Sequence, residues 1–285
     1  MNKKLICTAA VAALFSASAV FAGAPDTVMP APNAFDGFYL GATGSFHHTS
    51  FTTKNNTDLF LNNVPVLDLP LTVTAPILTQ NNGGDSTDLF GGFQGGFGKT
   101  FNHRWYAGVV GFAEFGDASQ TSTTVLLPTL AGILDVSRST KASVSSDYGV
   151  AFKPGVLLSP TTLAYAKLGA VWANIKVNDD VTAALLGINF GPAPTSGSST
   201  EVAFLWGFGV EQFIYQDVLS LNVEYTFADF GSANADQGTL VIVDNPVVTT
   251  GQQPQQIGLN FNSSASAKIS ALTAGLNVHF GRDWL

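Results

Sequence analysis

The chain has few of the features that stabilise or anchor most proteins. Its only cysteine is Cys7, so the sequence beyond residue 22 offers no disulfide framework. Charged residues make up 11%, well below the roughly one quarter that is usual in soluble domains. After residue 22 no segment is long and apolar enough to cross a bilayer as a helix, since Val202–Val210 has only strand length. Two interpretations remain: a large soluble β-sandwich, or a barrel whose apolar face points outward.

The first 22 residues have the order of an export signal. Lys3 and Lys4 are followed by an apolar stretch from Leu5 to Val20, and Val20-Phe21-Ala22 offers a small-residue cleavage site. We therefore expect a signal peptide at residues 1–22, a periplasmic lead-in at 23–35 and a barrel domain at 36–285. Loss of the two lysines changes 12 basic and 20 acidic residues to 10 and 20, a formal charge of −10. We expect no nucleic-acid partner for so acidic a chain.

The rest of the chain alternates apolar and polar residues in segments of barrel-strand length. There are about eight: 38–51, 87–99, 105–116, 144–158, 163–175, 201–214, 219–228 and 267–280. Short connections fall at Thr100–Arg104, Ser159–Thr162 and Tyr215–Val218, and long ones at residues 52–86, 117–143, 176–200 and 229–266. Short turns at one end and long loops at the other are typical of an outer-membrane barrel, and a sandwich has no reason to sort its loops this way. We therefore predict an all-β, transmembrane, antiparallel up-and-down barrel of about eight strands, with short periplasmic turns and long extracellular loops.

Period two assigns each residue of these segments to a face. The outward sets are large and apolar, as in Val202, Phe204, Trp206, Phe208 and Val210. Aromatic girdles are expected at both boundaries. The residues expected near the turn end are Phe97, Trp105, Phe280 and Trp284, and those near the loop end are Phe51, Phe115, Tyr148, Trp172 and Phe227.

The same parity turns the rare charges inward. They are Glu114, Lys153, Lys167, Glu211 and Glu224. Opposite charges in a narrow lumen must pair, because an unpaired buried charge costs several kcal/mol. We predict an ion-pair network that fills the lumen and fixes register, which is an ordinary content of small barrels. The alternative is a gate that controls a conductance.

Several motifs invite other functions and are weak. Gly95–Thr100 is similar to a phosphate-binding loop, but Phe93 stands where that motif needs a glycine, and the glycines are better explained as room for larger lumen side chains. His47 and His48, with acidic residues such as Asp58 and Asp85, suggest a metal site or a hydrolase, yet no Gly-x-Ser-x-Gly or His-Glu-x-x-His run occurs. Asp179-Asp180 is interpreted as a solvated loop tip. We expect no cofactor, no metal and no enzyme activity.

Three short motifs support a family resemblance. These are Phe38-Tyr39-Leu40-Gly41, Trp105-Tyr106-Ala107-Gly108 and the segment Thr273–Phe280, with Thr273, Gly275, Val278 and Phe280 in its key places. With the export signal, they make the chain resemble small bacterial outer-membrane β-barrels of the OmpA/OmpX-like and opacity-type surface antigen families. The last motif resembles the C-terminal signal that is read by the barrel-assembly machinery.

The resemblance implies an integral protein of the outer membrane that contacts outer-membrane lipid and lipopolysaccharide. It also implies that external loops mediate surface contact, such as adhesion to a host or surface ligand, and that the barrel supports envelope integrity. Our leading hypothesis is a non-enzymatic barrel that acts through its loops. A small or gated porin-like channel is the second hypothesis and a lipid-modifying enzyme the third.

Overall fold

The computed structural model describes residues 34–66, 69–125, 134–185, 188–245 and 255–280. The expected signal peptide (1–22), most of the lead-in (23–35) and Trp284 lie outside these residues. Within the described part, no helix is long and apolar enough to cross a membrane.

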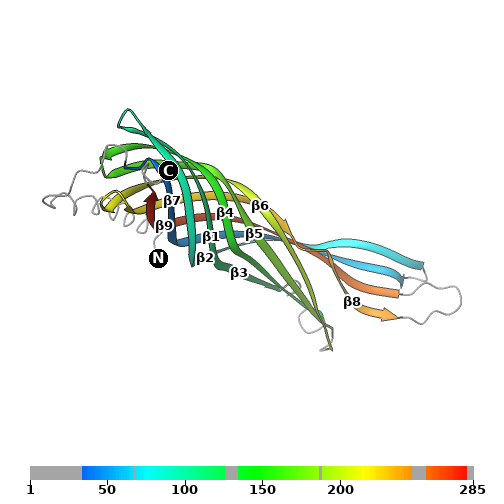
Figure 1. Ribbon diagram of the computed structural model, residues 1–285. Coiled ribbons are helices and arrows are strands. Elements are labelled where there is room, and N and C mark those ends of the chain that lie inside the picture. Colours follow the sequence, from blue (N-terminus) through cyan, green and yellow to red (C-terminus); the bar gives the residue numbers. More distant parts are fainter. Residues whose placement is uncertain (1–33, 67–68, 126–133, 186–187, 246–254, 281–285) are drawn as a thin grey trace.

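The described residues form nine strands in one antiparallel sheet (Figure 1). The strands are β1 (Gly37–Val66), β2 (Leu69–Phe101), β3 (Trp105–Val125), β4 (Leu134–Ser159), β5 (Thr162–Leu185), β6 (Ile188–Tyr215), β7 (Leu219–Asn234), β8 (Gly238–Asn245) and β9 (Gln255–Phe280). Neighbours in sequence pair in order from β1 to β7, β7 pairs with β9, and β9 pairs back to β1. Eight strands therefore close a ring, while β8 adds to β9 alone. The predicted all-β barrel of about eight strands is confirmed.

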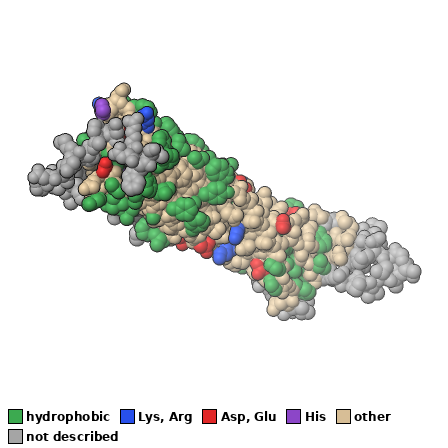
Figure 2. All heavy atoms as spheres, in the orientation of Figure 1, with side chains coloured by type: hydrophobic (Ala, Val, Ile, Leu, Met, Phe, Trp, Pro, Cys, Tyr) green, Lys and Arg blue, Asp and Glu red, His purple; other side chains and the backbone are tan. Residues whose placement is uncertain are grey.

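The two faces of the ring have the predicted character. Large side chains are exposed on the outside, among them Phe204 (65%), Phe93 (61%) and Trp105 (60%). Figure 2 shows hydrophobic side chains gathered over one half of the visible face, with charged side chains mainly toward the ends of this region. Because water would disfavour so much exposed apolar surface, this region indicates a lipid environment.

One assignment in the predicted girdles was wrong. Phe51 is 2% exposed and lies inside the ring, where it packs with Phe90 and other inward side chains. Tyr39, Ser45, His47 and Phe51 share the inward face of β1, so odd-numbered residues of this strand point to the lumen. The aromatic character of Phe51 suggested lipid contact, but strand parity decides the face.

The three short connections are confirmed, and they define what we term the turn end of the ring. The residues between paired strands there are Asn102–Arg104, Pro160–Thr161 and Gln216–Val218. Asn102, His103 and Gln216 have positive φ angles of 50°, 57° and 46°, which tight turns require.

The long connections were predicted as loops, and this is wrong for most of their residues. Strands β1 and β2 contain 30 and 33 residues and stay paired from Gly37↔Gly98 to Val66↔Leu69. Segments rich in Thr, Asn and Ser lack a continuous apolar face, so their periodicity was weak. Backbone pairing does not need that face, and β-branched threonine favours extended structure.

The ring opens into two facing sheets at the other end, which we term the extended end (Figure 1). Pairing between β2 and β3 stops at Gly91↔Phe115, and pairing between β6 and β7 stops at Leu205↔Ala228. Beyond these points one sheet contains β2, β1 and β9, with the end of β7 and then β8 paired to β9. The other sheet contains β3, β4, β5 and β6.

Three apolar clusters fill the interior along its length. The turn-end core contains Phe35, Tyr106, Leu163, Tyr165 and Phe213. The middle core includes Phe51, Phe90, Val144, Ile175, Leu205, Phe230 and Ile269. The outer core joins the two sheets through Val136, Val181, Ala183, Leu240, Ile242, Leu259 and Phe261. The fold therefore has an interior packed with side chains from the turn end into the extended end.

Candidate functional site

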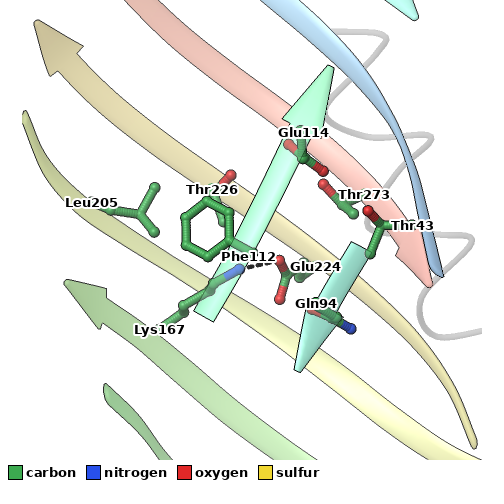
Figure 3. Close-up of a pocket in the computed structure, with 9 residues that line it drawn as sticks. All are labelled: Thr43, Gln94, Phe112, Glu114, Lys167, Leu205, Glu224, Thr226 and Thr273. Carbon is green, nitrogen blue, oxygen red and sulfur yellow. Dashed lines mark hydrogen bonds and ion pairs between the residues drawn. The ribbon is translucent and has the colours of Figure 1, made fainter. Parts of the chain in front are cut away.

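The predicted lumen charges lie inside the ring, in a layer between the turn-end core and the middle core. Lys153 Nζ contacts Glu211 Oε2 at 2.7 Å, and Lys167 Nζ contacts Glu224 Oε1 at 2.6 Å. All four residues are at most 4% exposed. Figure 3 shows the second pair, with Lys167 reaching Glu224 beside the ring of Phe112. Alternation along β4–β7 brings these side chains together because each occupies an inward position of its strand.

Glu211 is the most extensively bonded carboxylate of this layer. Besides Lys153, it accepts hydrogen bonds from Ser220 Oγ at 2.6 Å and from Asn277 Nδ2 at 2.9 Å. His279 Nε2 lies 3.0 Å from the same oxygen. Three neighbouring elements, β6, β7 and β9, are thereby joined through one buried group. Such charge-assisted bonds in a dry interior are stronger than neutral ones and offset part of the desolvation cost.

Aromatic rings complete the surroundings of both lysines. Lys153 Nζ lies 3.9 Å from the centre of the Tyr165 ring and 5.2 Å from that of Tyr39. Lys167 Nζ lies 4.1 Å from the centre of the Phe112 ring. Attraction between a cation and a ring face grows where water is excluded, so these contacts stabilise the buried ammonium groups.

Glycines provide the space for these rings, as the sequence indicated for the Gly95–Thr100 segment. A Cβ at Gly96 would lie 2.6 Å from Tyr39 Oη, and one at Gly209 would lie 2.7 Å from Tyr165 Oη. Both distances are below van der Waals contact, so larger residues at these positions would displace the tyrosines.

Glu114 differs from the other predicted charges because its direct partner is a histidine. His47 Nε2 lies 2.9 Å from Glu114 Oε2, and His47 Nδ1 lies 3.6 Å from Asp147 Oδ2. The imidazole stacks on Phe90 with ring centres 4.0 Å apart. The two carboxylates thus face opposite ring nitrogens, which is the arrangement of a histidine shared by two acids.

His47, Glu114 and Asp147 are also the group best placed to hold a metal ion. One ligand atom from each lies within 4.8 Å of the others, and all three residues are buried. The geometry fits a metal poorly, however, because one ion cannot contact both nitrogens of a single ring and the two acids flank different nitrogens. Of the other candidates from the sequence, His48 contacts Thr87, and Ser50 donates to Asp85; neither pair reaches this group.

The space left between these layers is small. A cavity of about 20 Å³ is lined by Glu114, Lys167 and Glu224 together with polar and apolar neighbours (Figure 3). A second of about 20 Å³ adjoins His47 and Asp147. The two cavities among the lumen charges are therefore too small to hold more than about one water molecule each.

A further buried ion pair lies in the extended end and was missed by the sequence reasoning. Arg138 of β4 and Asp179 of β5 are both buried, and Arg138 Nε donates to both Asp179 oxygens at 3.0 Å. The guanidinium also donates across to the facing sheet, to Asn56 O (2.8 Å), Thr57 Oγ1 (2.9 Å), Asn262 O (2.7 Å) and Ser263 Oγ (2.6 Å). Interpretation of Asp179 as part of a solvated loop tip was therefore wrong. Its parity within a longer strand was the signal that could have identified it.

The residues of the expected assembly signal occupy both faces of β9. Thr273 and Gly275 point into the ring, and Val278 and Phe280 point out of it. A Cβ at Gly275 would overlap the side-chain oxygen of Asn222, so a larger residue there would displace Asn222. Phe280 pairs with Phe38 of β1 and so lies at the seam that closes the ring.

The buried pair of Lys167 and Glu224 generates a stability prediction. Lys167→Met leaves Glu224 buried with Tyr165 as its remaining hydrogen-bond donor, so we expect unfolding in lipid vesicles to become easier by about 3–5 kcal/mol. The double variant Lys167→Met/Glu224→Gln should recover part of this loss, because neither buried charge remains. Denaturant titration measures both.

Lys268→Met is the control. The Lys268–Asp229 pair has the same 2.6 Å distance, but its side chains are 56% and 50% exposed, so the loss of this lysine should lower the free energy of unfolding by less than about 1 kcal/mol. Equal losses for the buried and the exposed lysine would contradict the prediction.

Arg138 generates a second prediction, confined to the extended end. Arg138→Met removes the bonds between the two sheets and leaves Asp179 unpaired, so we expect a loss of about 3–5 kcal/mol there. Limited proteolysis should then cleave the extended end while the membrane-embedded ring stays intact. Lys54→Met, which removes an exposed charge from the same end, should leave the cleavage pattern unchanged. A protease-resistant Arg138→Met protein would show that the outer core alone holds the sheets together.

Comparison with known proteins places this architecture in a family. No curated protein matches the chain. The outer membrane protein OprG from Pseudomonas aeruginosa is similar over 86% of this chain and 97% of its own, at 12% identity and a TM-score of 0.35. The protease OmpT from Escherichia coli covers 90% of this chain and 100% of its own (7%, 0.36), and the attachment invasion locus protein Ail of Yersinia pestis 78% and 98% (10%, 0.25). Likenesses this distant carry no argument about function.

The family assignment rests instead on the sequence match and the closed ring. Residues 7–280 match the outer membrane protein beta-barrel domain. The match spans every strand of the ring and nearly the whole chain. The chain belongs to the outer membrane protein β-barrel family.

Proposed function

We propose that this outer-membrane barrel conducts no solutes and acts outside the cell through the two sheets of its extended end, in contact with other surfaces. The turn end then faces the periplasm and the extended end faces outward, as in barrels with short turns and long outer segments. The observation that carries the proposal is the packed interior. Apolar clusters alternate with paired charges along the lumen, and the two cavities among the lumen charges hold about one water each.

The length of the strands supports an external role. A barrel strand needs about 9–11 residues to cross the hydrocarbon core. Strands β1 and β2 have 30 and 33 residues, so most of each lies beyond the membrane. An anchor in the membrane requires no such extension.

The extended end also has the order that a recognition surface requires. The outer core contains side chains of both sheets, and Arg138 donates hydrogen bonds from one sheet to Thr57 and Ser263 of the other. A contact surface built on paired strands loses little conformational entropy on binding. This favours surface contact, such as adhesion, with support of the envelope as a second consequence of a rigid barrel.

Catalysis is not part of the proposed function. The histidine that sits between two acids, His47, is 1% exposed, and the middle core covers it toward the extended end. A substrate would have to displace packed side chains to reach it. Mass analysis of outer-membrane lipid from cells with and without the protein tests this point, and a modified lipid species found only in producing cells would support the enzyme hypothesis instead.

The packed lumen predicts the outcome of conductance measurements. In planar bilayers we expect negligible current through the wild-type protein. Glu224→Gln and Lys153→Met, which each break one lumen pair, should also pass negligible current, because the apolar cores above and below stay in place. Discrete channel openings in either variant would support a gated channel and contradict the proposal.

Shortened hairpins test the role of the extended end. One variant joins Lys54 to Asn81 through an Asn-Gly turn, which removes the β1–β2 tip in register. The other joins Asn178 to Ser196 in the same way and carries Arg138→Met, so that no charge loses its partner. We expect both proteins to assemble in the outer membrane, and producing cells to lose autoaggregation and adherence to cultured epithelial cells.

The matched control changes the opposite end of the barrel. Asn102→Gly alters a periplasmic turn at a residue whose φ of 50° suits glycine, and it should leave adherence unchanged. Adherence that persists in both shortened variants would rule out the extended end as the contact surface.

A further inference from the structure

An apolar groove lies on the lipid-facing wall of the ring, where β2, β3 and β4 run side by side. It has a volume of about 650 Å³. Its floor is formed by small residues, Gly95 and Gly111, which are directly paired across β2 and β3, and Ala113. A Cβ at Gly111 would find its nearest neighbours 3.9 Å away, so the space over this glycine is open.

Large side chains form the walls of the groove. Leu40 and Phe93 stand on one side, and Tyr148 and Trp172 on the other. The Tyr148 and Trp172 rings stack with centres 5.8 Å apart. Because aromatic pairs of this kind mark the membrane–water boundary, the groove lies in the outer leaflet. Its volume and apolar walls suit an acyl chain, and lipid is the medium that surrounds it.

Two lysines continue this face beyond the aromatic pair. Lys176 of β5 is four positions beyond Trp172, about 13 Å along the strand. Lys141 of β4 pairs with Asn178, so the two lysines are diagonal neighbours on adjacent strands, and their Cα atoms lie about 7–8 Å apart. Both are exposed, and neither forms an ion pair with another residue in the described parts of the chain.

Two unpaired cations at this spacing repel each other, and an anion between them relieves the repulsion. We infer from their place beyond the aromatic pair that the two lysines lie at the level of the lipid headgroups, where lysine side chains reach phosphates along their flexible stems. In one molecule that carries both a phosphorylated headgroup and acyl chains, the phosphate would pair with the lysines and an acyl chain would fill the groove.

We propose that the groove over Gly111, with Lys141 and Lys176 above it, is a specific binding site for a phosphorylated glycolipid of the outer leaflet. An acyl chain lies in the groove against Phe93 and Trp172, and a headgroup phosphate contacts the two lysines. The site is independent of any surface partner of the extended end, because it faces the membrane. Bound lipid would tie the β3–β5 wall to the leaflet that surrounds it.

Lipid titration of the purified full-length protein in detergent, read by native mass spectrometry, tests the site. The probes are diphosphorylated hexa-acyl lipid A, the same lipid without phosphates, and phosphatidylglycerol. We expect the wild type to bind diphosphorylated lipid A at least tenfold more tightly than the dephosphorylated form. In the variant Lys141→Gln/Lys176→Gln, the loss of each lysine should weaken the binding of diphosphorylated lipid A by a factor of about five.

The groove is tested separately from the charges. Gly111→Leu places an apolar side chain in the open space and should weaken binding of all three lipids without unfolding the ring. The matched controls are Gly44→Leu, at an exposed position of β1 with no atom within 4 Å of its Cβ, and Lys54→Gln, an exposed lysine of the other sheet. Resistance of the folded band to SDS at room temperature shows that each variant is assembled.

Two results would overturn the proposal. One is lipid A affinity that is unchanged in both Lys141→Gln/Lys176→Gln and Gly111→Leu. The other is a protein dimer that Gly111→Leu abolishes while lipid binding persists, since a second copy of the chain would then occupy the groove.

Discussion

Closure of the ring between β1 and β9 is the constraint on which the rest of the structure depends. The two strands pair from Phe38↔Phe280 to Asn62↔Gln256. In hydrocarbon each unpaired backbone group costs several kcal/mol, so a sheet with open edges cannot cross a membrane and a closed one can. Eight strands also set the diameter, which leaves an interior just wide enough for side chains. The packed lumen of the described residues follows from the number of strands.

Because the interior is narrow, any change of strand register that moves an inward side chain to the other face costs free energy. A register slip of one residue would turn Lys153 toward lipid and leave Glu211 unpaired. We therefore infer that the ion pairs specify register, whereas we expect their net contribution to stability to be modest because desolvation opposes the attraction. Apolar clusters on both sides of the charged layer keep water out and so strengthen the pairing. The apolar and charged side chains that pack the lumen therefore also limit the space that is left in it for water.

Beyond the membrane the ring has a different shape because its two seams open. Sheets that no longer close into a ring must bury their inward faces against each other, and the outer core and Arg138 do this. The resulting two-layer extension is ordered by pairing and packing, and this order makes it suited to contact with other surfaces. The lipid-facing wall carries a separate feature, the apolar groove over Gly111, with the exposed Lys141 and Lys176 beyond its aromatic pair.

The sequence by itself determined the fold class, the three short turns and the inward position of Glu114, Lys153, Lys167, Glu211 and Glu224, because alternation with period two is a local property. Only the tertiary structure decided which charges meet: Lys153 with Glu211, Lys167 with Glu224, and Glu114 with His47. It also decided the length of the strands and the burial of Arg138 and Asp179. The residues around these two are mostly polar, so the sequence showed no alternation of apolar and polar residues from which their inward position could be predicted. Partner choice and strand extension depend on register between distant strands, and register is fixed only when the ring closes.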